Sequence, residues 1–130
     1  MGGRGTFSVG KNPGFAYESI DDINGIKIVV PKNSVVALKL PEESHSPNTA
    51  YVIFDKDGVF HQYREYNENH LVSLEIGYHH EPSLGRGDVL HIHEYKIPGV
   101  DYHRQATKRL LTPEDSLYKK YKFLFKGVKI

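Results

Sequence analysis

Five of the eight histidines lie in the central part of the chain, at His61, His79, His80, His91 and His93. The last two form an HxH pair in "VLHIHEYK", and alternate residues of a β-strand point to the same side of the sheet. Imidazole nitrogens bind transition metals when neutral and exchange protons near neutral pH. The spacing therefore points to two chemistries, metal binding and acid–base catalysis, and both stay open at this level.

The elements that would position these histidines are short strands. Residues 50–55, 59–66, 71–80 and 89–96 show the apolar and aromatic patterning of an antiparallel meander. Asp57-Gly58 supplies a hairpin turn between the first two. Shorter strands are expected before the meander, at 26–30, after the turn signal Asn24-Gly25, and at 35–40.

A helix is expected at the carboxyl end, with Thr112 as its cap and Pro113 at its first position. Its apolar stripe would cover one face of the sheet. The predicted fold class is thus α+β, an antiparallel β-meander of about four strands plus short N-terminal strands, with a C-terminal helix packed on one face. Residues 1–14 are rich in glycine and are expected to be a flexible segment, followed by one globular domain at 15–130. The apolar stripe of the expected C-terminal helix consists of Leu117, Tyr121, Leu124 and Phe125.

The alternation of the strands assigns the histidines to one face. If Val52, Phe60 and Ile76 are buried together, a one-residue slip of any strand would invert it, so the register is nearly fixed. On that register His61 lies opposite His79, and His79 lies opposite His91. The sequence therefore predicts three imidazoles side by side on an exposed sheet face, close to Tyr63 and His93.

The first hypothesis for this face is a metal-independent, ribonuclease-like reaction. Cleavage of RNA needs a base for the 2′-hydroxyl, an acid for the leaving oxygen, and a cation for the phosphate. The acid–base residues would be His61, His79 and His91, with Tyr63 beside them. Residues for substrate binding would be Arg64, Lys96, Tyr95 and His45.

The second hypothesis is that the domain binds a divalent transition metal, such as zinc, instead of working without a cofactor. Its ligands would be His61, His79, His91 and His93, because neutral imidazoles suit zinc, iron and copper. A third hypothesis is a module without turnover, which recognises another protein through a sheet edge or an aromatic face.

The amino-acid composition limits the chemistry that these three hypotheses about function can use. The chain has 130 residues, 17 Lys and Arg against 16 Asp and Glu, and no cysteine, so thiolate chemistry and disulfides are excluded. A net charge of +1 gives no broad basic field, so any contact with RNA must be local. The sequence shows neither a membrane-spanning run nor a signal peptide, and we expect a cytoplasmic protein, or one delivered to another cell or carried by a virion, with no membrane partner.

Three short motifs carry a family resemblance: "GGRG" near the start, "HIHEY" in the last strand of the meander and "LTPED" before the final helix. Together they resemble small uncharacterised domains at the carboxyl end of head-morphogenesis proteins of prophages and mobile elements. The architecture is also similar, more loosely, to ribonuclease toxins of the barnase and colicin type. The first resemblance implies a phage structural protein as partner, and the second implies RNA and an immunity protein.

Overall fold

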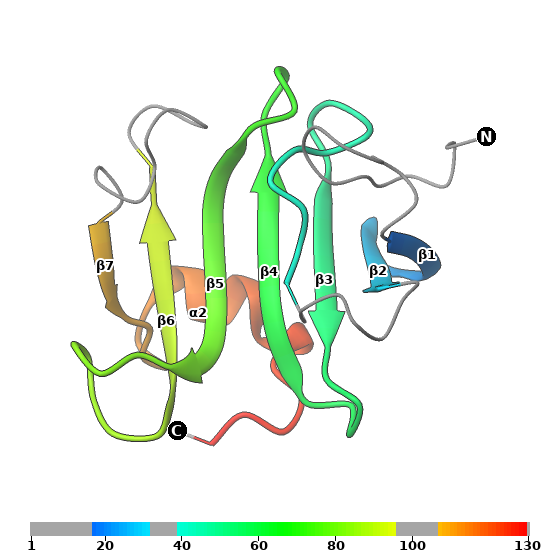
Figure 1. Cartoon of the computed structure of the whole chain (residues 1–130). Helices are drawn as coiled ribbons and strands as arrows, with labels where there is room; N and C mark the ends of the chain where they lie inside the picture. The colour runs from blue at the N-terminus through cyan, green and yellow to red at the C-terminus, as the bar shows by residue number, and fades with distance from the viewer. Residues whose placement is uncertain (1–16, 32–38, 96–106, 130) are drawn as a thin grey trace.

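The computed structural model describes residues 17–31, 39–95 and 107–129, which form one seven-stranded sheet with a short helix near the carboxyl end (Figure 1). The strands follow one another across the sheet in chain order. They are β1 (Tyr17–Ile23), β2 (Ile26–Pro31), β3 (Ala50–Phe54), β4 (Phe60–Tyr66), β5 (Val72–His80), β6 (Asp88–Glu94) and β7 (Thr107–Leu110).

The predicted meander corresponds to β3–β6, in which every neighbouring pair is antiparallel. The sheet extends beyond the expected four strands and short N-terminal strands, because β7 adds to the far edge of β6. The hairpin of β1 and β2 joins the other edge through a parallel seam of two residue pairs, Lys27–Tyr51 and Ile28–Val52. Most of the strand expected at 35–40, and the expected flexible segment at 1–14, lie outside the described residues.

The carboxyl end forms α2 (Ser116–Tyr121) and the 3-10 turn η1 (Lys122–Leu124). The predicted start at Thr112 is wrong. Residues 112–115 form a turn instead, in which the Asp115 N–H donates to the Thr112 carbonyl at 2.9 Å. The Asp115 carboxylate accepts from Arg109 at 3.0 Å, so it is held toward β7 and caps no helical N–H.

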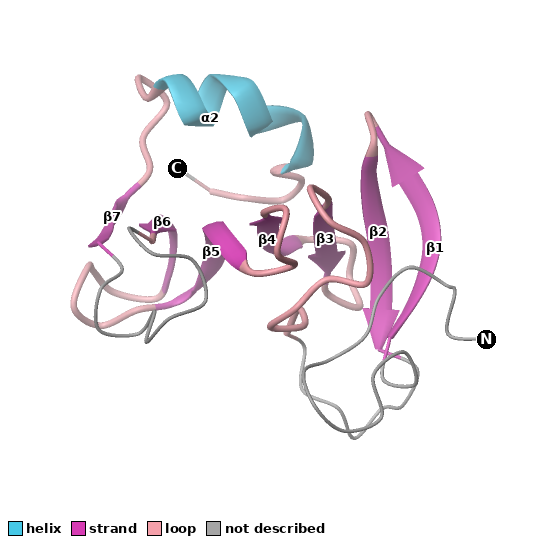
Figure 2. Ribbon diagram, turned by 90° about the horizontal axis from the view of Figure 1, so that it is seen from above, coloured by secondary structure: helices cyan, strands magenta, loops and turns pink. Residues whose placement is uncertain are grey.

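The expected apolar stripe is confirmed, since Tyr121, Leu124 and Phe125 are buried and Leu117 packs against them. This stripe lies on one side of the meander, where α2 crosses it (Figure 2). Residues of the sheet that face the helix form one apolar cluster with it. They are Val52, Phe60, Tyr63, Leu74, Ile76, Leu90 and Ile92.

A second apolar cluster covers part of the opposite face, so the sheet is buried on both sides. Its members include Leu40, Tyr51, Ile53 and Val72, and all four have 1 % exposure or less. The prediction of an exposed histidine face is therefore wrong at its centre, because His91 on that face has no exposed area at all.

A β-bulge in β4 decides which of its side chains face the helix. Ile53 pairs with Gln62 whereas Phe54 pairs with Phe60, which leaves His61 as an extra residue. Phe60 and Tyr63 both reach the helix side, although regular alternation would put residues three apart on opposite faces. As a result His61 and Gln62 both belong to the other face, and Tyr63 does not.

Candidate metal centre

Four histidines form a row on the side of the sheet opposite α2. The ring centroids of His61 and His79 are 5.6 Å apart, those of His79 and His91 4.6 Å, and those of His91 and His93 5.2 Å. We call His61, His79, His91 and His93 the histidine row. The structure thus brings together the imidazoles that alternation alone assigned to one face.

The register that produces the row differs from the predicted one. His91 pairs with Gly77, and His79 pairs with Val89, so the two imidazoles meet diagonally across β5 and β6 and not directly. This is a shift of two residues, which leaves every side chain on its face. For that reason the prediction of the face survives although the prediction of direct opposition is wrong.

Gly77 makes the diagonal contact possible. A methyl group on its α-carbon would stand 2.9 Å from His79 Nε2 and 3.3 Å from His91 Cε1. The first separation is shorter than a side-chain carbon tolerates, and the second is a tight contact, so a side chain here would push at least the His79 ring away. The lack of a side chain at this position therefore gives the two imidazoles the space in which they meet.

One ring nitrogen of His91 is buried without a hydrogen-bond partner among the described residues. Its Nδ1 lies 2.9 Å from the Val89 carbonyl, which can only accept, so Nδ1 carries the proton. Nε2 is then the basic nitrogen, and it is buried with no hydrogen-bond partner in the part of the chain that the structure describes. A buried acceptor without a partner is costly, and a histidine held by a carbonyl at its other nitrogen is the usual arrangement of a metal ligand.

Two further residues with metal-binding side chains lie beside His91. Glu81, His91 and His93 each offer a ligand atom, and these atoms all lie within 4.8 Å of one another. Bonds from zinc to nitrogen or oxygen are about 2.0–2.2 Å, so the three groups would have to move inward by on the order of 1 Å to hold an ion. Two imidazoles and a carboxylate are a ligand set of catalytic zinc sites and of non-haem iron sites.

The surroundings keep these donors in the protonation state that a metal needs. Burial lowers the pKa of His91, and the charges of His79 and His93 lower it further against the Val89 hydrogen bond. Burial also lowers the pKa of His93. The hydrogen bond from Lys108 lowers the pKa of Glu81, so near neutral pH the site offers two neutral rings and a carboxylate.

A buried ion pair between Arg64 and Glu75 lies next to the histidine row. Arg64 Nη2 lies 3.0 Å from Glu75 Oε1, and both side chains are under 10 % exposed. Burial alone would raise the pKa of Glu75, but the charges of Arg64 and His93 and the hydrogen bonds from Gln62 and Arg64 bring it down to about 2. Since Glu75 pairs with His93 across β5 and β6, this fixed carboxylate stands next to a proposed ligand.

The residues predicted to bind substrate lie elsewhere or are already engaged. Arg64 also donates to the carbonyls of Leu40 and Pro41, at 3.0 and 3.1 Å, and is buried, so it cannot meet a phosphate from solvent. Tyr95 donates to Glu75 at 3.2 Å, within the same network. His45 is exposed on the loop before β3, a strand that β4 and β5 separate from β6, and Lys96 lies outside the described residues.

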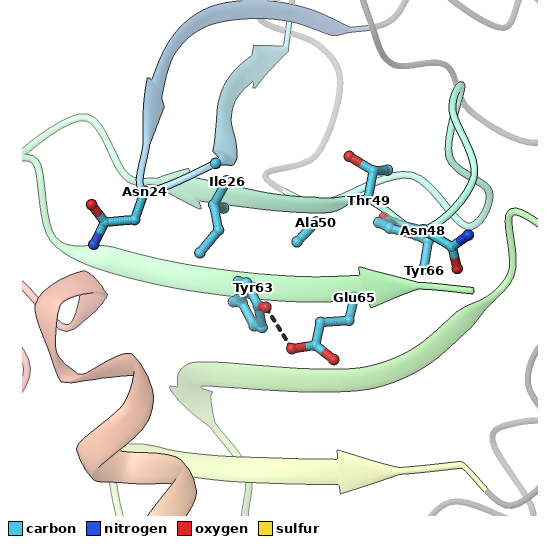
Figure 3. Close-up of a pocket in the computed structure, with 9 residues that line it drawn as sticks. Asn24, Ile26, Asn48, Thr49, Ala50, Tyr63, Glu65 and Tyr66 are labelled. Atoms are coloured by element: carbon cyan, nitrogen blue, oxygen red, sulfur yellow. Dashed lines mark hydrogen bonds between the residues drawn. The ribbon is translucent and has the colours of Figure 1, made fainter. Parts of the chain in front are cut away.

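Tyr63, predicted as a catalytic neighbour, faces the helix. Its hydroxyl donates to Glu65 Oε2 at 2.7 Å, and its ring packs on Tyr121 at a centroid distance of 4.7 Å. Figure 3 shows Tyr63 and Glu65 side by side on β4, in a shallow cleft of about 360 Å³ that the turn between β1 and β2 borders. The Tyr121 hydroxyl also donates to Glu65 Oε2, so this carboxylate ties α2 to the sheet.

Sequence reasoning missed two residues of the site, Glu81 and Lys108. Glu81 follows directly after β5 and is two residues from His79, so an extension of the strand's alternation could have placed it on the same face. Lys108 belongs to β7, in "QATKRLL", a stretch without alternating apolar residues. It pairs with His93, and only the strand pairing reveals this.

Comparisons of the chain with models of protein families, with characterised proteins and with solved structures gave no match. Within residues 17–31, 39–95 and 107–129, no helix is long and apolar enough to cross a lipid bilayer.

Proposed function

We propose that this protein binds a divalent transition metal ion such as zinc through His91, His93 and Glu81. The observation that carries the proposal is the approach of one ligand atom from each of these three residues to within 4.8 Å of one another, at a histidine whose buried Nε2 lacks a partner among the described residues. Three protein ligands leave a coordination position for water or substrate, as in catalytic zinc sites. Metal binding would also remove the cost of the unpaired nitrogen.

A hydrolytic reaction is the chemistry that this site supports best. Zinc lowers the pKa of a bound water to about 7 and so supplies a nucleophile at neutral pH. His79 and His61 continue the row away from the proposed ligands and are half-buried, so they stand ready to transfer protons. RNA is the first substrate to test, because its cleavage uses both a base and an acid.

Direct measurement of metal content tests the first step. Protein purified without chelators or immobilised metal should contain close to one equivalent of metal by elemental analysis, or should take up one equivalent of zinc or cobalt. His91→Ala and Glu81→Gln should lower the affinity at least tenfold, whereas His80→Ala, at an exposed position at the end of β5, should not. Equal binding by all four proteins would refute the proposed ligands.

A metal-independent, ribonuclease-like effector is the second candidate. It is favoured by the contact of His61 with His79, two imidazoles on neighbouring strands at a ring distance of 5.6 Å. An RNA cleavage assay separates the candidates: the metal-dependent enzyme loses activity in chelator and regains it with zinc, whereas the second keeps it. A module that binds a phage structural or immunity protein, as the family resemblance implies, would cleave RNA under neither condition.

A further inference from the structure

An ion pair between Lys108 and Glu81 borders the proposed metal centre. Lys108 Nζ lies 2.9 Å from Glu81 Oε1, and the two side chains are 34 % and 20 % exposed. Lys108 is also the partner of His93 across β6 and β7. An ammonium group therefore stands beside two of the three proposed ligands and is bonded to the carboxylate of one of them.

We propose that a metal ion displaces Lys108 from Glu81 and that the freed ammonium then holds a phosphate group on the metal. This inference rests on the proposed function. Glu81 must move toward His91 and His93 to complete a coordination shell, and a divalent ion repels an ammonium group at this distance. Lys108 can swing away because about a third of its side chain, 34 %, is exposed to solvent.

The charge balance calls for an anion. Glu81 with Lys108, and Glu75 with Arg64, are two neutral pairs around the histidine row. A divalent ion bound by neutral imidazoles adds two positive charges to this balance, in a site whose central ligand is fully buried. A phosphate dianion, or the phosphodiester of RNA together with a metal-bound hydroxide, compensates them.

The position of Lys108 favours phosphate over a neutral ligand. A lysine ammonium is a common partner of phosphate oxygens, and here it would act together with an open metal position. Arg64, the arginine predicted for this role, is buried against Glu75 and cannot take part. Lys108 thus takes the place that sequence reasoning gave to Arg64.

Lys108→Met tests the exchange, with Lys119→Met as control, since Lys119 is an exposed lysine on α2, on the other side of the sheet. Cobalt binding is followed by visible absorption, and inorganic phosphate is then titrated into the cobalt-loaded proteins. Loss of the ion pair should tighten cobalt binding by roughly threefold. Phosphate binding should weaken by roughly tenfold or more, the loss of one charge-assisted hydrogen bond.

The outcomes separate this inference from the proposed function. If the wild-type protein takes up no cobalt, both are overturned. If it takes up cobalt but Lys108→Met leaves the phosphate affinity unchanged or weakens cobalt binding, the exchange alone is overturned. Lys108→Arg keeps the charge and should retain phosphate binding, and loss of binding there would also count against the exchange. Circular dichroism at 20 °C shows whether each variant is folded.

Discussion

The unpaired nitrogen of His91 leads to an unusual expectation for the substitution His91→Leu. In the metal-free protein, a buried acceptor without a partner costs about 1–3 kcal/mol. Leucine removes that cost and fills a similar volume, but it also removes the hydrogen bond from Nδ1 to the Val89 carbonyl, worth about 1 kcal/mol. The metal-free variant should therefore be as stable as the wild type, or more stable by up to about 2 kcal/mol.

Metal should reverse this order. At a zinc concentration one hundred times the dissociation constant, binding stabilises the folded wild type by about 2.7 kcal/mol, and the variant has lost the ligand through which it gains. For a domain of this size, 1 kcal/mol corresponds to a shift in Tm of about 4 °C. The wild type should thus gain roughly 10 °C with zinc, and His91→Leu far less.

Thermal unfolding followed by circular dichroism, in chelator and in zinc, measures both halves of the expectation. His80→Leu is the matched control, because it makes the same chemical change at an exposed position. A metal-free His91→Leu protein that is less stable than the wild type by 2 kcal/mol or more would refute the reasoning. That result would mean that the imidazole makes a favourable contact that the described residues do not account for.

Three further expectations concern the support of the row. Glu75→Gln leaves the Arg64 guanidinium buried without its counter-charge. Urea denaturation should show a loss of about 3–5 kcal/mol in the free energy of unfolding. The double variant Arg64→Met, Glu75→Leu should recover most of that free energy. The pKa of Glu75 is about 2 in the folded protein against an ordinary 4.5, so its contribution to the free energy of unfolding is complete above pH 4.5 and is lost as the pH falls toward 2. The wild type should therefore lose on the order of 3 kcal/mol of stability over this range. Glu75→Gln should show no such dependence on pH. Gly77→Ala puts a methyl group 2.9 Å from His79 Nε2, so it should displace the His79 ring. The rate of the proposed metal-dependent reaction should fall more than the free energy of unfolding does. An unchanged reaction rate together with unchanged histidine NMR shifts would contradict the proposed role of the glycine.

The meander and the face of the histidines were predictable because both follow from alternation over several residues. Val52, Ile76 and Ile92 occupy alternating positions of their strands that place them on one apolar face, and the same alternation places His79, His91 and His93 on the other face. A register error of two residues leaves these assignments unchanged, so they tolerate the imprecision of sequence reasoning. The strand pairs β3–β6 accordingly have the predicted order.

Features that depend on one residue or on a distant partner were not predictable. The bulge at His61 has no sequence signature that separates it from regular alternation, and it moved Tyr63 to the helix side. Arg64 reads as a surface charge until the pairing of β4 with β5 places it beside Glu75. The helix begins later than its cap signal indicated, after a turn at residues 112–115 in which Asp115 also bonds to Arg109 of the preceding strand.

The narrow parallel seam between β2 and β3 has a consequence for how the molecule opens. In the strand ladder, two residue pairs join β2 to β3, whereas seven pairs join β5 to β6; outside the ladder, the hairpin packs on the sheet through Tyr17, Ile26 and Val29. Regions with few attachments open at lower free energy than the body of a domain. Amide protons of the hairpin should therefore exchange with solvent deuterons well before those of the central strands, so the outer ribbon can detach and return while the layer that holds the imidazoles stays intact.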